Sequence, residues 1–164
     1  MKTKLLIVIA AGLFMLGTGC SKDNEGCTDI NADNYDTQAE VNKGCTYRYA
    51  ISVTVGGVPA AKPSGESWDI EGGMPDLKIV FAKNESGHVD VITSTAENTQ
   101  SATLSLPAEV QLTNGDWKYD LLDDDIGLPE VIASGHFNPL KDGSAGTVKI
   151  INGTIAITFN YVVK

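Results

Sequence analysis

The stretch TVKIINGTIAITFNYVV, residues 147–163, decides the fold class, because a turn signal separates two β-rich runs. Thr147–Ile151 and Thr154–Val163 are rich in β-branched and aromatic residues, and Asn152-Gly153 between them favours a tight hairpin. Six similar runs precede them, at Tyr47–Val55, Leu77–Ala82, His88–Thr93, Ala102–Leu106, Trp117–Leu122 and Glu130–Phe137. No stretch sustains a 3.6-residue period over three turns. The sequence therefore predicts an all-β fold, an antiparallel eight-stranded β-sandwich.

Alternation within these runs also predicts which side chains face the core. The expected inward set is Ile51, Val53, Ile79, Phe81, Trp117, Ile155, Ile157 and Phe159. Trp68 falls in a loop, where we expect partial exposure. An exposed aromatic face there would favour contact with a glycan.

Charge excludes some classes of partner. The 164 residues include 21 acidic and 12 basic side chains, for a net charge of −9. A nucleic-acid binder needs a clustered Lys/Arg face to neutralise phosphates, so we expect no nucleic-acid partner. The same balance opposes simple electrostatic docking to anionic lipid.

The first twenty residues have the pattern of an export signal. Lys2 and Lys4 precede the apolar run Leu5–Leu16, which is shorter than the roughly 20 residues that span a bilayer. Small residues then lead to Cys20. This pattern resembles a bacterial lipoprotein signal, with residues 1–19 as the signal peptide. The alternative is an ordinary secretory signal with a cysteine nearby.

The lipoprotein resemblance implies that Cys20 becomes the mature N-terminus and carries acyl chains such as palmitate. Residues 20–25 would form a lipidated tether, and their Lys-plus-acid run resembles the surface-export tag of lipoproteins in Bacteroidota-type bacteria. Removal of Lys2 and Lys4 would change the net charge from −9 to −11. We therefore expect a protein anchored by lipid in the outer membrane and exposed at the cell surface.

Once Cys20 is acylated, Cys27 and Cys45 remain as a pair. In an exported protein such a pair indicates a disulfide. Residues 26–47 resemble a short cysteine-bounded module of the form GCTD…NYD…GC that recurs in exported proteins of these bacteria. Its side chains Asp29, Asn31, Asp33 and Asp36 offer oxygens to Ca²⁺, but the module lacks the glycine and terminal glutamate of an EF-hand loop. We interpret the module as a structural spacer before a sandwich domain at residues 48–164.

Acidic residues gather in two loops of that domain, around Asp69–Asp76 and Asp123–Glu130. Adjacent carboxylates repel each other by about 1 kcal/mol per pair at 4 Å, even in a water-like dielectric. A bound cation removes that repulsion, and Ca²⁺ takes six to eight oxygen ligands. The alternative is that these are solvated acidic loops on a generic sandwich.

The two loops resemble those of a C2 domain, an eight-stranded sandwich that binds Ca²⁺ at one edge. The matching features are Asp69, Gly72-Gly73 and Pro75-Asp76-Leu77 in one loop, and Asp123-Asp124-Asp125 followed by Glu130 in the other. The resemblance implies the Ca²⁺ ligands Asp69, Asp76, Asp123, Asp125 and Glu130, with Asp124 contributing its backbone carbonyl. The Asn-Pro-x-Trp/Phe element and the polybasic strand of many C2 domains are missing; Glu97-Asn98-Thr99 is a remnant of the former. An Ig-like or unclassified sandwich is the alternative fold.

The sequence lacks a recognisable catalytic motif. His88 and His136 have no metal-ligand spacing, and there is no nucleophile elbow or glycine-rich phosphate loop. We therefore expect a lipid-anchored binding or structural module of the cell envelope rather than an enzyme, in contact with a protein or glycan at the surface. The alternative is an accessory glycan- or nutrient-capture lipoprotein of an uptake system.

Overall fold

The computed structural model describes residues 23–69, 73–87, 89–125 and 128–164. Within these ranges there is no helix, and hence none long and apolar enough to cross a membrane. The predicted signal peptide (residues 1–19), the lipidation site Cys20 and His88 lie outside the described residues.

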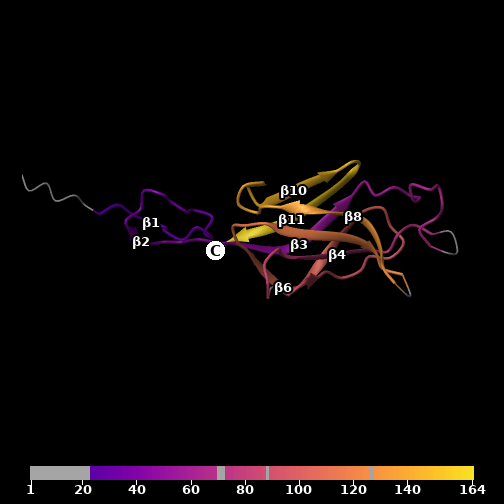
Figure 1. Ribbon diagram of the computed structural model, residues 1–164, viewed down its shortest axis with the longest axis horizontal. Coiled ribbons are helices and arrows are strands. Elements are labelled where there is room, and N and C mark those ends of the chain that lie inside the picture. Colours follow the sequence, from indigo (N-terminus) through magenta and orange to yellow (C-terminus); the bar gives the residue numbers. More distant parts are fainter. Residues whose placement is uncertain (1–22, 70–72, 88, 126–127) are drawn as a thin grey trace, which may run out of the picture.

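The chain forms short and long strands that fall into three sheets (Figure 1). Their bounds are β1 Glu25–Gly26, β2 Val41–Asn42, β3 Arg48–Gly56, β4 Leu77–Lys83, β5 Val91–Ile92, β6 Ala102–Leu112, β7 Trp117–Asp123, β8 Glu130–Phe137, β9 Gly143–Ser144, β10 Thr147–Asn152 and β11 Ile155–Val163. From β3 onward, one sheet has the order β6-β3-β11-β10-β9 and the other β5-β4-β7-β8. All neighbours within these two sheets are antiparallel.

The predicted all-β antiparallel sandwich is therefore confirmed. Each of the eight expected runs contains a strand, although the run His88–Thr93 is reduced to the two residues of β5. The short strand β9 was not predicted, because Gly143 and Ser144 carry no β signal. It pairs with the start of β10 and lies at the edge of the five-stranded sheet.

The hairpin between β10 and β11 turns one residue further along the chain than expected. Asn152 pairs with Ile155, so Gly153 and Thr154 form the turn. Gly153 has a φ of 62°. A glycine with positive φ at the first central position matches the strand twist in a two-residue hairpin.

Aromatic rings join the two sheets at the centre of the core. Phe159 of β11 lies edge-on to Phe81 of β4, with ring centroids 5.0 Å apart, and stacks on Phe137 of β8 at 4.6 Å. Phe81 also contacts Trp117. Such pairs add about 0.5–1.5 kcal/mol each beyond area burial. The sandwich thus has one continuous core that includes residues of both sheets.

Two expectations about burial were wrong. Ile51 is 43% exposed, whereas the rest of the expected inward set is buried. Against β11, Ala50 and Ser52 of β3 oppose the consecutive residues Tyr161 and Asn160, so Ile51 is the extra residue of a bulge; Ile51 faces outward while Ala50 enters the core. Trp68 is buried, and its indole N–H donates to the carbonyl of Pro59 at 2.8 Å.

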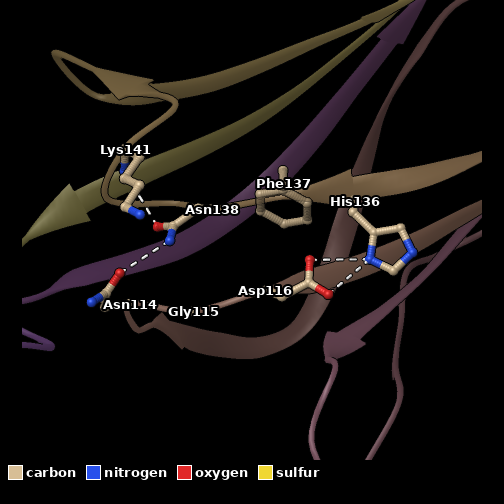
Figure 2. Close-up of a pocket in the computed structure, with 7 residues that line it drawn as sticks. All are labelled: Asn114, Gly115, Asp116, His136, Phe137, Asn138 and Lys141. Carbon is tan, nitrogen blue, oxygen red and sulfur yellow. Dashed lines mark hydrogen bonds and ion pairs between the residues drawn. The ribbon is translucent and has the colours of Figure 1, made fainter.

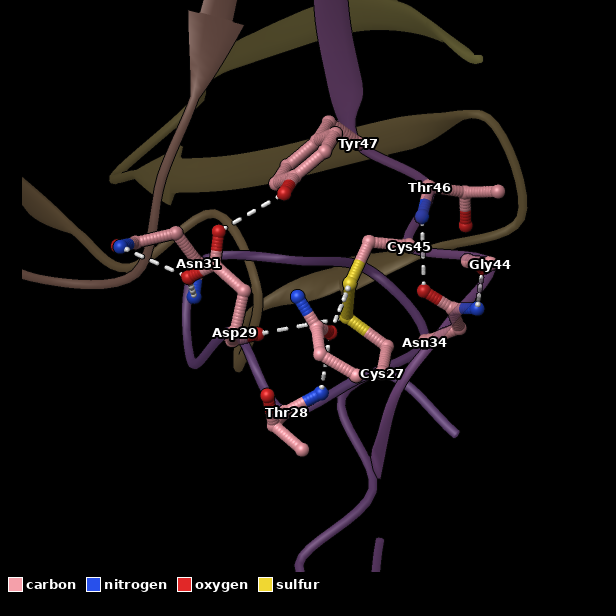
Figure 3. The surroundings of a disulfide bond; sticks show 10 residues. Cys27, Thr28, Asp29, Asn31, Asn34, Gly44, Cys45, Thr46 and Tyr47 are labelled. Atoms are coloured by element: carbon pink, nitrogen blue, oxygen red, sulfur yellow. Dashed lines mark hydrogen bonds between the residues drawn. A yellow bond between two sulfur atoms is a disulfide. The ribbon is translucent and has the colours of Figure 1, made fainter. Parts of the chain in front are cut away.

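Cys27 and Cys45 form the predicted disulfide, with sulfur atoms 2.05 Å apart (Figure 3). Near the disulfide, the side chain of Asn34 bonds to the segment around Cys45: its amide donates to Gly44 O, and its Oδ1 accepts the N–H of Thr46. Strands β1 and β2 pair in parallel. With so little apolar surface, the segment depends on these bonds for its order.

The disulfide module is fixed to the sandwich by contacts at the start of β3. The hydroxyl of Tyr47 donates to Asp29 at 2.8 Å, and Tyr47 and Lys164 exchange two backbone hydrogen bonds. Arg48 forms an ion pair with Asp33, donates to Pro139 O and lies over the ring of Tyr161. Asp29 and Asp33, considered as oxygen donors for Ca²⁺, are therefore engaged in joining the module to the domain.

The aromatic core gives a test of the fold. Replacing Phe159 with Ala removes a side chain of one sheet that is 0% exposed and packs on two aromatic rings of the other sheet. We expect a loss of about 3–5 kcal/mol in the free energy of unfolding, measured by denaturant titration. Val163→Ala on the same strand, at a position 47% exposed, should stay within about 0.5 kcal/mol. Equal effects of the two variants would contradict the assigned core.

Candidate functional site

The acidic loops meet at the end of the sandwich away from the disulfide module. Leu77 at the start of β4 pairs with Asp123 at the end of β7, which also pairs with Glu130 at the start of β8. At the opposite end of the sheet, β8 ends at Phe137 and leads to Pro139, whose carbonyl accepts a hydrogen bond from Arg48 beside the module. Figure 1 shows this arrangement: β1 and β2 lie beyond one end of the sandwich, and the loops between β3 and β4 and between β7 and β8 lie at the other.

Asp123 is the centre of the cluster. Its side chain is 0% exposed. Oδ1 accepts the backbone N–H of Asp76 at 2.7 Å, while buried Oδ2 has no hydrogen-bond partner among the described residues. Burial is the main cause that raises the pKa of Asp123, and the nearby charges of Asp125, Asp76 and Glu130 add to it. A buried carboxylate oxygen without a partner is unfavourable unless a proton or a cation reaches it.

Asp69 and Asp125 complete a three-carboxylate group. One oxygen each from Asp69, Asp123 and Asp125 lie within 4.8 Å of one another. The pKa of Asp125 is raised by burial, then by its hydrogen bond with Asp69 and by neighbouring negative charges. Gly73 permits this approach, because a Cβ there would lie 1.8 Å from Oδ2 of Asp69. The arrangement offers several hard oxygen donors to one point, as a cation such as Ca²⁺ requires.

Asp76 and Glu130 lie at the edge of this group. Oδ1 of Asp76 accepts the backbone N–H of Asn98 at 2.6 Å. Glu130 is half-exposed, and its Oε2 lies 2.6 Å from the ammonium of Lys62. Both carboxylates are close enough to raise the pKa values of Asp123 and Asp125. All five residues implied as ligands therefore gather at one end of the domain.

The side chain of Asp124 lies apart from the cluster. Its Oδ2 accepts hydrogen bonds from Lys78 at 2.8 Å and from the hydroxyl of Thr95 at 2.9 Å. Burial disfavours its ionised form, but these two bonds outweigh burial and lower the pKa. Any direct contribution of Asp124 to a cation would thus come from its backbone, as the C2 resemblance implied.

Two residues outside the implied ligand set also shape the site: Asn98, which the sequence marked only as part of a remnant element, and Lys62, which no sequence pattern indicated. Asn98, with an unusual φ of 50°, accepts the N–H of Met74 at 2.8 Å and donates its own N–H to Asp76. Asparagine is among the few residues that enter this left-handed region readily. Lys62 forms the ion pair with Glu130, whose hydrogen bond raises the pKa of the lysine although burial lowers it. Both contacts depend on tertiary packing, which no local pattern encodes.

A cavity of about 570 Å³ lies at the end of the sandwich opposite the acidic cluster (Figure 2). It is lined by Asn114, Gly115, Asp116, His136, Phe137, Asn138 and Lys141. Nδ1 of His136 lies 3.0 Å from both carboxylate oxygens of Asp116. The hydrogen bond from Asn84 is the main cause that lowers the pKa of Asp116, and His136 adds to it. The lining side chains include no hydroxyl or thiol.

Comparison with known proteins adds two structural likenesses. The chain matches no family model and no curated protein sequence. Among solved structures, a chain described as the structure of a C2 domain aligns with a TM-score of 0.48 and 13% identity, over 73% of this chain and 97% of that one. A chain described as BON1-C2B aligns with a TM-score of 0.49 and 10% identity, over 79% and 99%. These likenesses concern the fold, and the site rests on its own geometry.

The raised pKa of Asp125 gives a prediction that can be tested on the metal-free protein, with a chelator present. A raised carboxyl pKa means that the ionised group destabilises the folded state at neutral pH. This effect is relieved as pH falls through the folded pKa and is absent below the ordinary value of 3.8. Asp125→Asn should therefore raise the melting temperature at pH 7, and the difference from wild type should shrink as pH falls towards 4. A difference that grows as the solution is acidified would contradict the assignment.

Proposed function

We propose that this protein is a lipid-anchored binding module of the cell envelope whose acidic end binds Ca²⁺. The observation that carries the Ca²⁺ proposal is the buried carboxylate of Asp123: its Oδ2 has no hydrogen-bond partner among the described residues, and one of its oxygens lies within 4.8 Å of oxygens of Asp69 and Asp125. The donor set is made of carboxylates, which suit a hard cation. No nitrogen or sulfur ligand joins the cluster among the described residues.

The remaining groups fit the same interpretation. Asp76 and Glu130 lie at the edge of the three carboxylates and can add oxygens, and the backbone N–H of Asp124 donates to the carbonyl of Asp76 at 2.9 Å. Bound Ca²⁺ would neutralise the repulsion among these side chains. We infer that the ion orders the two loops, which then contact a protein or glycan at the cell surface.

The anchor is a proposal from the sequence. The apolar run Leu5–Leu16 followed by Cys20 supports lipidation at Cys20, and the Lys-plus-acid run after it supports export to the outer face of the outer membrane. The alternative role in glycan or nutrient capture was to be favoured by an exposed aromatic face around Trp68. Because Trp68 is buried, it offers no such face.

Ca²⁺ binding predicts a shift in thermal stability. A ligand that binds only the folded state adds RT ln(1 + [L]/Kd), or about 2.7 kcal/mol at 100 times Kd. We expect the melting temperature of the full chain to rise with CaCl₂ relative to EDTA. Asp123→Asn with Asp125→Asn should abolish the rise, whereas Asp33→Asn in the disulfide module should leave it unchanged. No shift in wild type at millimolar Ca²⁺ would refute the site.

Surface exposure predicts sensitivity to protease on intact cells. Added protease should remove the protein from whole cells, and Cys20→Ser should release it from the membrane fraction or block its maturation. Immunoblotting of shaved cells measures the first effect, and fractionation with metabolic palmitate labelling measures the second. Full protection from protease with normal labelling would place the anchored protein on the periplasmic side and contradict the proposed exposure at the cell surface.

A further inference from the structure

Lys62 places a positive charge beside the acidic cluster. Its ammonium lies 2.6 Å from Oε2 of Glu130, and its side chain is 21% exposed. The charge of Asp123 also acts on it. Ion pairs between fully solvated side chains contribute little, but this one adjoins a buried carboxylate and is only partly open to solvent.

The loop that carries Lys62 holds the lysine in place. Its backbone N–H donates to Glu66 O, and its carbonyl accepts the N–H of Gly65, both at 2.8 Å. Ala61 and Ser67 form an antiparallel bridge across the base of this turn. The ammonium also lies 5.8 Å from the ring centroid of the buried Trp68. Lys62 is therefore presented to Glu130 by an ordered loop.

The other lysine of this end acts on a different acid. Lys78 is exposed to a similar degree, 25%, but its ammonium pairs with Asp124, whose side chain lies apart from the cluster. The two lysines thus differ in the carboxylate that each engages. Lys62 alone of the two engages a residue of the implied ligand set.

We propose that Lys62 is an internal counter-cation that competes with Ca²⁺ for Glu130 and so sets the cation affinity of the acidic end. This inference rests on the proposed Ca²⁺ function and deepens it. Without the metal ion, the ammonium balances part of the cluster's negative charge. When Ca²⁺ binds, Glu130 must either leave the lysine to contact the metal ion or stay paired with it, which keeps a positive charge beside the metal ion. In both cases Ca²⁺ binds more weakly.

The test compares Ca²⁺ affinity in four forms of the full chain, solubilised in detergent: wild type, Lys62→Met, Lys62→Arg and Lys78→Met. Isothermal titration calorimetry with CaCl₂ gives Kd, and melting in EDTA gives the stability of the metal-free form. We expect Lys62→Met to lower Kd on the order of tenfold. Lys62→Arg, which keeps the charge, and Lys78→Met, which removes an equal charge from Asp124, should stay within about threefold of wild type.

In EDTA, Lys62→Met should melt below Lys78→Met, because the cluster loses its counter-charge. An unchanged or higher Kd for Lys62→Met, with wild type binding Ca²⁺, overturns the inference and leaves the proposed function standing. Binding by Lys62→Met alone would reject Ca²⁺ binding by the native protein and support Lys62 as its replacement. If no form binds Ca²⁺, the proposed function fails; equal melting of the two methionine variants in EDTA then overturns the role of Lys62 as well.

Discussion

The hydrogen bond from the backbone N–H of Asp76 to Oδ1 of Asp123 joins the two acidic loops and fixes the geometry of that end of the sandwich. It satisfies one oxygen of a fully buried carboxylate that groups with those of Asp69 and Asp125, and it leaves the other oxygen without a hydrogen-bond partner among the described residues. Strand pairing puts Leu77 and Glu130 opposite Asp123, so Asp76 and Glu130 arrive on either side of it. The cluster is therefore built by the register of β4, β7 and β8, and the rigid sheet holds acids that would otherwise separate in solution.

The strand positions could be predicted from the sequence because their signal is local, whereas the acidic set was implied by the resemblance of the two loops to those of a C2 domain. Alternating apolar residues bounded by turn residues mark the strands, and Asp76, Asp123 and Glu130 adjoin strand ends that an antiparallel sheet brings together. The outward position of Ile51 could not be predicted, since the bulge that causes it depends on the pairing of β3 with β11. The burial of Trp68 depends on Pro59, which supplies the acceptor that lets an indole N–H leave water.

The position of Lys62 shows the same limit at the site itself. Its neighbours in sequence form an ordinary turn, and nothing in Lys62-Pro63-Ser64-Gly65 indicates a contact with Glu130. Charge counting alone would treat the lysine as solvated. The tertiary fold instead places one of the few basic side chains of an acidic protein against the cluster. The balance of charge at the acidic end is thus a property of the folded chain, which composition does not reveal.

The contacts between the disulfide module and the sandwich place the acidic end at the far side of the domain from the module. Tyr47, Arg48 and Lys164 bind the disulfide module at one end of the sandwich, and the carboxylates lie at the other. Under the proposed lipid anchor, the chain would leave the membrane through residues 20–25, pass through the module and present the acids at the far end. Contact of those loops with the anchoring membrane is disfavoured both by this distance and by the negative charge of the cluster. Under the proposed anchor, a partner of the acidic loops would therefore approach from the side away from the membrane.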